Sequence, residues 1–414
     1  MLRFAMSPTH DMSIEELRVA IVNDIISKQK GEHLIVRIDD GNKAQNIIGK
    51  DTEIMEILEK FALRHDKVFH QSEKRHLHQT LAIRLLEEGK AFVCTCHQKE
   101  EEPYTGTCFN VDPTMLATLK EKQIPFVIRV KKPTETIIYD DLIQGKVTAT
   151  SDEIDSFIIL NTDNTPTDDF ASACDDILSG VNFIIEKEDT NFHAPKQKYI
   201  QTLLGYETET TYAHLPHLQH HDQDITVQWL FEEGFIPDAI INYLLLAGNT
   251  NPPKQIFTLP EAIEWFRLET MGKQTFDLKQ LRAINREHLK RIDDKTLSSL
   301  FGFADGDIGK LAKLYLEAHA STVKELESKI KAIFSPKNFE NEWKEKMRMM
   351  EEIILSAPMI DQFDAFQTYL EEKSGFTKEE LSKPLRLLLT GTQDGPDLSS
   401  IYPLIKPYLL EIAS

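Results

Sequence analysis

The sequence has few cysteines and no long hydrophobic run. Four cysteines among 414 residues do not suggest a disulfide framework. No apolar segment approaches the roughly 20 residues that a membrane-spanning helix needs. The amino terminus also lacks a basic segment followed by an apolar one, which is the pattern of a secretory signal. We therefore predict a cytoplasmic protein with no membrane partner.

Positive charge is also scarce. The chain has 47 lysines and arginines against 67 aspartates and glutamates, so its formal net charge is −20. This balance disfavours indiscriminate binding of polyanions, and we predict no DNA partner. Any contact with nucleic acid must then use a local basic stretch. Residues 282–291 are one candidate, although a solvated helix face explains that run equally well.

The length and the periodicity indicate several domains. A chain of 414 residues exceeds what one hydrophobic core usually supports, and its 41% hydrophobic and 28% charged residues are typical of a globular protein. Residues 2–5 and 34–38 read as strands, and residues 14–28 as a helix closed by Gly31. Residues 52–63 and 73–88 predict further helices, the second capped by Ser72 and stopped by Gly89.

The pattern changes twice along the chain. Between residues 92 and 176 it consists of short β-rich runs, such as 126–130 and 136–139, which indicates an inserted mixed unit. After Pro237 it becomes strongly helical, with amphipathic segments such as 337–355. We expect an α/β front, a β-containing insertion and an all-helical rear.

A series of short motifs resembles those of glutamyl-tRNA synthetases, in that family's order. The first is Leu2-Arg3-Phe4-Ala5-Met6-Ser7-Pro8-Thr9. The others lie at residues 36–40, 71–73, 86–92, 166–167, 175–176, 194–197, 214–216, 233–237, 276–277, 285, 384–386, 389–391 and 395–396. Each motif alone is weak, but the ordered set is specific and covers nearly the whole chain.

This resemblance implies an α/β Rossmann-type class I synthetase catalytic domain with a mixed α/β insertion, followed by an all-α anticodon-binding-like region. Five parts are expected: residues 1–92 and 176–237 as the two halves of the catalytic domain, 93–175 as an acceptor-stem-binding-like insertion, 238–300 as a stem-contact-like region, and 301–414 as the anticodon-binding-like domain. The resemblance also implies ATP as a substrate and tRNA as a partner. A shared fold does not establish activity, so the site residues must decide.

The first ATP-binding signature is replaced. Active relatives have a His-Ile-Gly-His-like motif where this chain has Ser13-Ile14-Glu15-Glu16. Ser13 and Glu16 have capping-box spacing, so they can satisfy the helix amides that would otherwise bind phosphate. Glu15 and Glu16 also place negative charge there, so we expect the site to repel ATP. A purely stabilising role for acidic residues in a first turn is the alternative, and His10 could stand in for a missing histidine.

The second signature, a Lys-Met-Ser-Lys-Arg-like loop, should follow His214. The chain instead runs through residues 219–224 to Trp229 without a lysine, so the loop is predicted to be deleted. Losing even one preorganised charge donor typically costs about 3 kcal/mol of transition-state stabilisation. Four histidines lie close together here: His214, His217, His220 and His221. His214 belongs to one of the family motifs. The other three predict a solvated turn, and a metal site is the less favoured alternative.

The amino-acid pocket is altered as well. The resemblance places Arg3, Ser7 and Asp39 in this pocket. At the positions where the family has a tyrosine, an asparagine and a distal arginine, this chain has Asp168, Ser172 and Glu186. A carboxylate in place of a guanidinium reverses the sign of the pocket and should abolish glutamate binding. The alternative is that Glu186 points to solvent. The pocket would then still lack the arginine that binds the substrate carboxylate. A cation or amine is then the better candidate ligand.

Cys94, Cys96 and Cys108 resemble the zinc module found in some members of the family. Three thiolates and a fourth ligand suit tetrahedral zinc. Tyr104 is the preferred fourth ligand by resemblance, and His97 is the alternative. Free thiols are the competing interpretation.

These observations predict a catalytically inactive relative of the synthetases that binds tRNA or a translation partner, such as a genuine aminoacyl-tRNA synthetase. Two alternatives stay open: a functioning glutamate–tRNA ligase with a degenerate site, and an altered enzyme with a cation- or amine-binding cleft.

Overall fold

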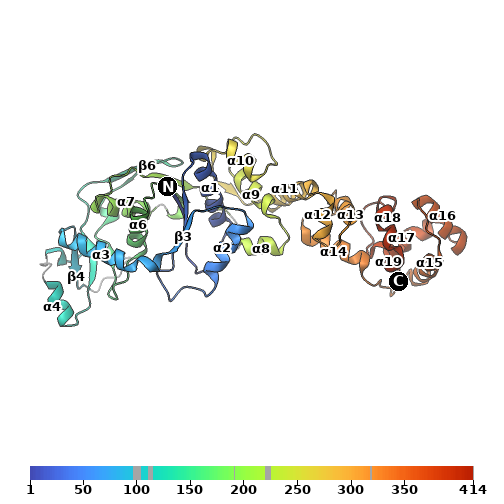
Figure 1. Cartoon of the computed structure of the whole chain (residues 1–414), viewed down its shortest axis with the longest axis horizontal. Helices are drawn as coiled ribbons and strands as arrows, with labels where there is room; N and C mark the ends of the chain where they lie inside the picture. Colours follow the sequence, from blue (N-terminus) through green and yellow to red (C-terminus); the bar gives the residue numbers. More distant parts are fainter. Residues whose placement is uncertain (97–103, 111–114, 191, 220–224, 318, 414) are drawn as a thin grey trace. The chain divides into compact units, whose positions relative to one another are not determined.

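The computed structural model describes the chain except residues 97–103, 111–114, 191, 220–224, 318 and 414 (Figure 1). The chain forms two compact units. The first consists of Met1–Gln228 and Leu244–Phe276, and the second of Trp229–Tyr243 and Asp277–Ser414. No helix in the described part of the chain is long and apolar enough to cross a membrane.

A seven-stranded sheet organises the first unit, in the order β3-β2-β1-β9-β10-β6-β7. All neighbouring strands are parallel except the β6–β7 pair. The strands are β1 (Leu2–Met6), β2 (Leu34–Ile38), β3 (Lys67–His70), β6 (Ile137–Asp141), β7 (Gly145–Ala149), β9 (Phe183–Lys187) and β10 (Thr211–Leu215). The order reverses beside β1, and ligands of such sheets bind at the carboxyl ends of the strands flanking that point.

Helix α1 (Ile14–Lys30) packs against β1 and β9. It ends at Gly31, whose left-handed φ of 63° explains why glycine stands there. The other helices of this unit are α2 (Lys50–Lys60), α3 (Arg75–Glu87), α4 (Met115–Glu121), α5 (Ser151–Ile154), α6 (Asp168–Ser179), α7 (Ala194–Leu203) and α10 (Leu259–Trp265), with short 3-10 turns η1 (Gln71–Lys74), η2 (Cys108–Asn110), η3 (Glu188–Thr190) and η4 (Leu268–Thr270). The predicted cap by Ser72 is wrong, because Ser72 donates its amide and its hydroxyl to Asp40 instead.

Two smaller sheets complete the first unit. An antiparallel sheet joins β4 (Ala91–Cys94), β5 (Val127–Val130) and β8 (Ile158–Leu160), and its apolar side chains share a core with those of α3, α6 and α7. The parallel pair β11 (Leu218–Gln219) and β12 (Gln274–Thr275) forms the other.

The second unit is helical, as predicted for the rear of the chain. Helices α8 (Val227–Glu232) and α9 (Pro237–Leu246) each include residues of both units. The remaining helices are α11 (Leu278–Arg291), α12 (Asp294–Ser299), α13 (Asp307–Leu316), α14 (Val323–Phe334), α15 (Lys344–Ser356), α16 (Phe363–Ser374), α17 (Lys378–Thr390), α18 (Leu398–Ile405), η5 (Lys406–Tyr408) and α19 (Leu409–Ala413). Their buried leucine, isoleucine, methionine and tyrosine side chains form one core.

The expected insertion, residues 93–175, is divided between two sheets. Its strands β5 and β8 belong to the small antiparallel sheet, whereas β6 and β7 extend the large sheet beyond β10. The expected boundary at residues 175–176 also falls within helix α6. The five-part division therefore stays a proposal about function rather than a division into separate folding units.

Candidate functional site

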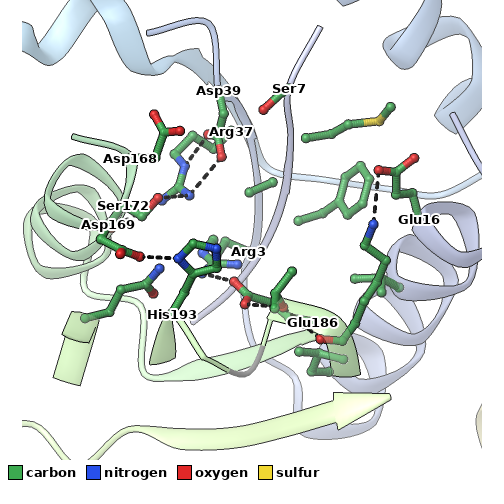
Figure 2. Close-up of a pocket in the computed structure, with 18 of the residues that line it drawn as sticks. Arg3, Ser7, Glu16, Arg37, Asp39, Asp168, Asp169, Ser172, Glu186 and His193 are labelled. Carbon is green, nitrogen blue, oxygen red and sulfur yellow. Dashed lines mark hydrogen bonds and ion pairs between the residues drawn. The ribbon is translucent and has the colours of Figure 1, made fainter. Parts of the chain in front are cut away.

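A cavity of about 270 Å³ opens at the carboxyl ends of β1 and β9, beside the start of α1 (Figure 2). Its lining includes many charged side chains. The lining residues are Arg3, Phe4, Ala5, Met6, Ser7, His10, Glu16, Val19, Arg37, Asp39, Asp168, Asp169, Ser172, Ile185, Glu186, Lys187, Thr190, His193 and Gln197. All six pocket residues expected from the sequence are thus brought together, and the position matches the rule for open parallel sheets.

Arg3 is held by two carboxylates at the base of this cavity. Its Nε donates to Asp176 Oδ1 at 2.9 Å, and its terminal nitrogen donates to Glu186 Oε1 at 2.6 Å. The Arg3 side chain is 2% exposed. These ion pairs engage two of the three guanidinium nitrogens of Arg3, and they place two carboxylates where they would repel an external carboxylate.

Glu186 is fixed from both sides. Besides accepting from Arg3, it accepts from the Thr190 hydroxyl at 3.1 Å. Burial alone raises the pKa of Glu186, but the charges of Arg3 and His214 and its hydrogen bonds lower it to about 2. The alternative that Glu186 points to solvent is therefore wrong, because the neighbouring strand β1 presents Arg3 to it.

Arg37 also has acidic partners in this cluster. It makes two parallel hydrogen bonds to Asp39, at 2.6 and 3.1 Å, and further contacts with Ser172 and Asp176. The resulting cluster, Arg3, Arg37, Asp39, Asp176 and Glu186, contains three carboxylates and two guanidinium groups. Burial raises the pKa of Asp176 despite both arginines.

The other basic residues of the lining also have acidic partners. His193 Nδ1 lies 2.7 Å from Asp169, and Lys187 Nζ lies 3.5 Å from Glu16 (Figure 2). His10 Nε2 lies 2.9 Å from Glu16. Each of the five basic side chains that line the cavity, histidines included, therefore contacts a carboxylate.

Asp168 differs from the other acidic residues of the lining. Among the described residues it makes no direct hydrogen bond or ion pair, and it is exposed at the first turn of α6. Partial desolvation of the Asp168 carboxylate, followed by the charges of nearby Asp39 and Asp169, raises its pKa. The cavity thus retains an acidic group but no uncommitted basic one.

The start of α1 is closed by its own side chains. The predicted capping box is confirmed, because Ser13 accepts from the Glu16 amide and Glu16 accepts from the Ser13 amide. The amide of Ile14, which is buried, donates to the Ile225 carbonyl at 3.0 Å. Burial opposes the ionisation of Glu16, but the Ser13 amide, Lys187 and His10 lower its pKa. Three amides at the helix start, those of Ser13, Ile14 and Glu16, are thereby used internally.

Glu15 takes a different direction from that expected. Its carboxylate accepts from the Leu218 amide at 2.8 Å and lies 3.1 Å from His217 Nδ1. It does not line the cavity, so of the two glutamates only Glu16 adds negative charge there. The reason is tertiary: β11 places an unpaired amide beside the first turn of α1.

The histidine cluster does not form one group. His214 is buried and lies 2.7 Å from Asp141, whereas His217 contacts Glu15. His220 and His221 lie outside the described residues, as does most of the segment where the second signature was expected. In the described part of the chain, only the three cysteines Cys94, Cys96 and Cys108 gather as metal ligands would.

Those cysteines and Tyr104 suit a metal ion. The three Sγ atoms lie within 4.8 Å of one another, and Cys96 and Cys108 are 3.3 Å apart. The Tyr104 hydroxyl accepts from the Cys108 amide at 2.8 Å. A Cβ at Gly106 would lie 2.8 Å from both Cys96 Sγ and the Tyr104 hydroxyl, so glycine permits their approach. Three sulfurs and one phenol oxygen match tetrahedral zinc; His97 lies outside the described residues.

The basic stretch on α11 is largely engaged within the protein. Arg282 pairs with Glu325 at 2.6 Å, Arg286 donates to the Ala320 carbonyl, and Lys290 pairs with Glu287. Arg291 is exposed at the carboxyl end of the helix. These contacts account for most of the run by packing of the second unit.

Several residues that line the cavity were not predicted from the sequence. Arg37 and Gln197 lie inside motifs that were recognised, and Asp169 directly follows a predicted site residue. They could have been found by extending those motifs. Lys187 directly follows Glu186, and His193 directly precedes the motif at residues 194–197, so both could have been found in the same way. Their pairing with Glu16 and Asp169 could not, because those partners are distant in the sequence.

Comparisons with known proteins identify the family of the chain and its fold. Residues 1–283 match the family described as tRNA synthetases class I (E and Q), catalytic domain. Over the full length of both chains, this chain is 57% identical to glutamate–tRNA ligase 2 of Sulfurovum sp. NBC37-1 and 44% identical to glutamate–tRNA ligase 2 of Sulfurimonas denitrificans. A crystallised glutamate tRNA ligase from Elizabethkingia meningosepticum, in complex with its amino acid, has the same fold, with a TM-score of 0.81 at 21% identity; the match covers 100% of this chain and 98% of that one.

Proposed function

Because this chain belongs to the glutamyl-tRNA synthetase family, we propose that it is a member that has kept the fold and lost the glutamylation reaction. It acts by binding tRNA or a partner of translation, such as a genuine aminoacyl-tRNA synthetase. The two steps that it has lost are recognition of glutamate and binding of ATP.

The contact between Arg3 and Glu186 carries this proposal. A substrate carboxylate needs a guanidinium with free, convergent donors. Arg3 instead donates to Asp176 and to Glu186, which stands where the family has an arginine. An external glutamate would have to displace a buried, ionised carboxylate and would meet its negative charge. Such an exchange costs several kcal/mol, which is enough to abolish useful binding.

The ATP-binding side supports the same conclusion. Ser13 and Glu16 satisfy amides of the α1 start that would otherwise face phosphate, and Glu16 adds a negative charge to the lining. Lys187 is the one lysine of that lining, and it pairs with Glu16. No residue between His214 and Trp229 is a lysine that could replace the missing loop.

We assign tRNA binding to the parts that the family resemblance places on tRNA: the insertion, residues 93–175, the stem-contact-like region, residues 238–300, and the helical rear, residues 301–414. The insertion carries the proposed zinc centre of Cys94, Cys96, Cys108 and Tyr104. When bound, zinc would cross-link the chain on either side of residues 97–103 and so hold the module in one shape.

Glutamate-dependent exchange of pyrophosphate into ATP tests the loss of catalysis. The glutamate tRNA ligase of Elizabethkingia meningosepticum serves as the positive control. We expect no exchange above background for this chain, with or without tRNA and zinc. Exchange that requires glutamate would overturn the proposal.

Filter binding of several tRNAs across a range of salt concentrations tests the proposed partner. Retained recognition predicts a preference for some tRNAs that persists as salt is raised, since shape and base contacts are screened less than phosphate contacts. Weak binding without preference, steeply reduced by salt, would contradict a tRNA-binding role and leave a protein partner as the remaining form of the proposal.

A second candidate function is that of a working glutamate–tRNA ligase. The observation favouring it is the 57% identity, over the whole chain, with a protein named as such a ligase. A third is an altered enzyme whose cleft takes an amine, which the uncommitted carboxylate of Asp168 favours. Positive exchange with glutamate identifies the ligase, and thermal stabilisation by amines but not by glutamate identifies the altered cleft.

A further inference from the structure

Arg129 on β5 is a buried arginine with unmet donors. It is 1% exposed, and its terminal nitrogen Nη1 donates to the Ser156 carbonyl at 2.8 Å. Its Nε and its other terminal nitrogen have no hydrogen-bond partner among the described residues. A buried cation without an anionic partner is strongly destabilising, so its presence calls for a compensating negative charge.

The cysteine module lies on the same side of the sheet. Arg129 is opposite Phe92 in the β4–β5 ladder, and Cys94 follows two residues later on β4, so the side chains of Phe92 and Cys94 project to one face. The Tyr104 ring lies over this face. Its centroid is 5.1 Å from Arg129 Cζ and 5.3 Å from the centroid of Phe92. The guanidinium therefore contacts the residue that we assign as the fourth metal ligand.

We propose that Arg129 is the fixed counter-charge of an anionic metal–thiolate centre formed by Cys94, Cys96 and Cys108 with Tyr104. This inference rests on the zinc centre proposed above. When a divalent ion binds, three metal–sulfur bonds form and the thiol protons leave to solvent. Two positive charges and three thiolates sum to −1 if the phenol stays neutral, and Arg129 balances that charge.

The charge balance explains why the unmet donors are tolerated. With metal bound, the field of the centre stabilises the guanidinium across the Tyr104 ring, and the guanidinium stabilises the thiolates. Without metal, the same arginine is a buried charge that lacks the counter-charge of the metal–thiolate centre. Arg129 should therefore strengthen metal binding while contributing little to the metal-free fold. A role limited to packing on Tyr104 would not depend on metal.

Zinc binding by the full-length protein and its variants tests this inference. The variants are Arg129→Met, Arg129→Lys and, as a matched control, Arg18→Met. Arg18 is equally buried, but its terminal nitrogens donate to the Pro216 and Ala247 carbonyls. Metal is removed with a chelator, and zinc affinity is measured by competition with a chromophoric chelator. Thermal unfolding is followed with and without zinc.

We expect one zinc per chain in the wild type and an affinity about 10- to 100-fold lower in Arg129→Met, with partial recovery in Arg129→Lys. Arg18→Met should keep the wild-type affinity. Metal-free Arg129→Met should unfold at or above the wild-type temperature, whereas the zinc-loaded variant should unfold below it.

Two outcomes would overturn the inference, and they are distinguishable. Unchanged zinc affinity in Arg129→Met, or an equal loss of stability with and without zinc, would make Arg129 a packing residue. A wild-type protein that binds no zinc would remove the metal centre itself. Neither outcome bears on the exchange assay, which tests the loss of catalysis separately.

Discussion

The two candidate sites of the first unit differ in the partners of their buried arginines. In the cavity, Arg3 contacts Asp176 and Glu186, whereas beside the cysteines Arg129 has only the Ser156 carbonyl among its described hydrogen-bond partners. A site whose charges are already paired offers little to a ligand. A buried charge without a partner instead indicates that something else belongs there. In the first site the buried arginine is paired within the protein. In the second site, donors of the buried arginine have no partner among the described residues.

This difference in charge pairing also distinguishes the two candidate sites in a way that the family resemblance alone does not. The family resemblance alone would assign glutamate and ATP to the first site and zinc to the second. The partners of each charged side chain discriminate between them, because electrostatic complementarity is a property of the site and not of the fold. Three substitutions would test the comparison.

Arg3→Met should have the largest effect. It leaves Glu186 and part of Asp176 as buried carboxylates without their main counter-charge, and breaking such a pair costs about 3–5 kcal/mol of unfolding free energy. Urea unfolding followed by circular dichroism measures the loss. The metal-free Arg129→Met variant, in which a buried cation is removed rather than a partner, should lose much less. Similar losses of unfolding free energy in the two variants would contradict the distinction between a paired and an unpaired buried arginine.

Glu186→Gln should alter the pH dependence of stability. The folded-state pKa of Glu186 is about 2, below its ordinary value of 4.5, so its ionisation stabilises the fold above pH 4.5. That stability, about 3 kcal/mol, is lost as the pH falls from about 4.5 to 2. We expect Glu186→Gln to flatten this part of the unfolding profile.

Glu261→Gln is the matched control for the pH profile. Lys254 and the Thr258 amide also lower the Glu261 pKa to about 2, but this carboxylate is exposed and solvent screens it. Its replacement should leave the acid limb of the profile nearly unchanged. An unaltered profile in Glu186→Gln would mean that Glu186 does not act as the internal carboxylate of Arg3.

Ser13→Ala should have the smallest effect, a loss of about 1 kcal/mol of stability from the missing helix cap. Thr377→Ala removes the same capping box from α17 in the second unit and should cost a similar amount. We expect that adding ATP shifts the unfolding temperature of neither variant. Stabilisation of Ser13→Ala alone by ATP would show that the α1 start still accepts phosphate once its own cap is removed.

Much of the fold was predictable from local sequence patterns. The strand at residues 34–38, the helix that begins after Ser13 and ends at Gly31, and the capping box all depend on residues a few positions apart. The cysteine cluster follows similarly, because Cys94 and Cys96 are close in sequence and Cys108 is 12 residues beyond Cys96. The Ser72 cap failed because Asp40, from another part of the chain, offered Ser72 a better partner.

The sequence alone determined the fold class, the missing signatures and the types of residue at the candidate sites. Only the tertiary structure decided which charges pair. Glu186 contacts Arg3 across 183 positions, and Glu15 accepts from the Leu218 amide across 203. Arg129, beside Tyr104, has donors without a partner among the described residues. Helix caps and turns are set by neighbours along the chain. The pairing of buried charges depends on the order of the strands and on which side chains share the same buried space. Local sequence patterns predict neither.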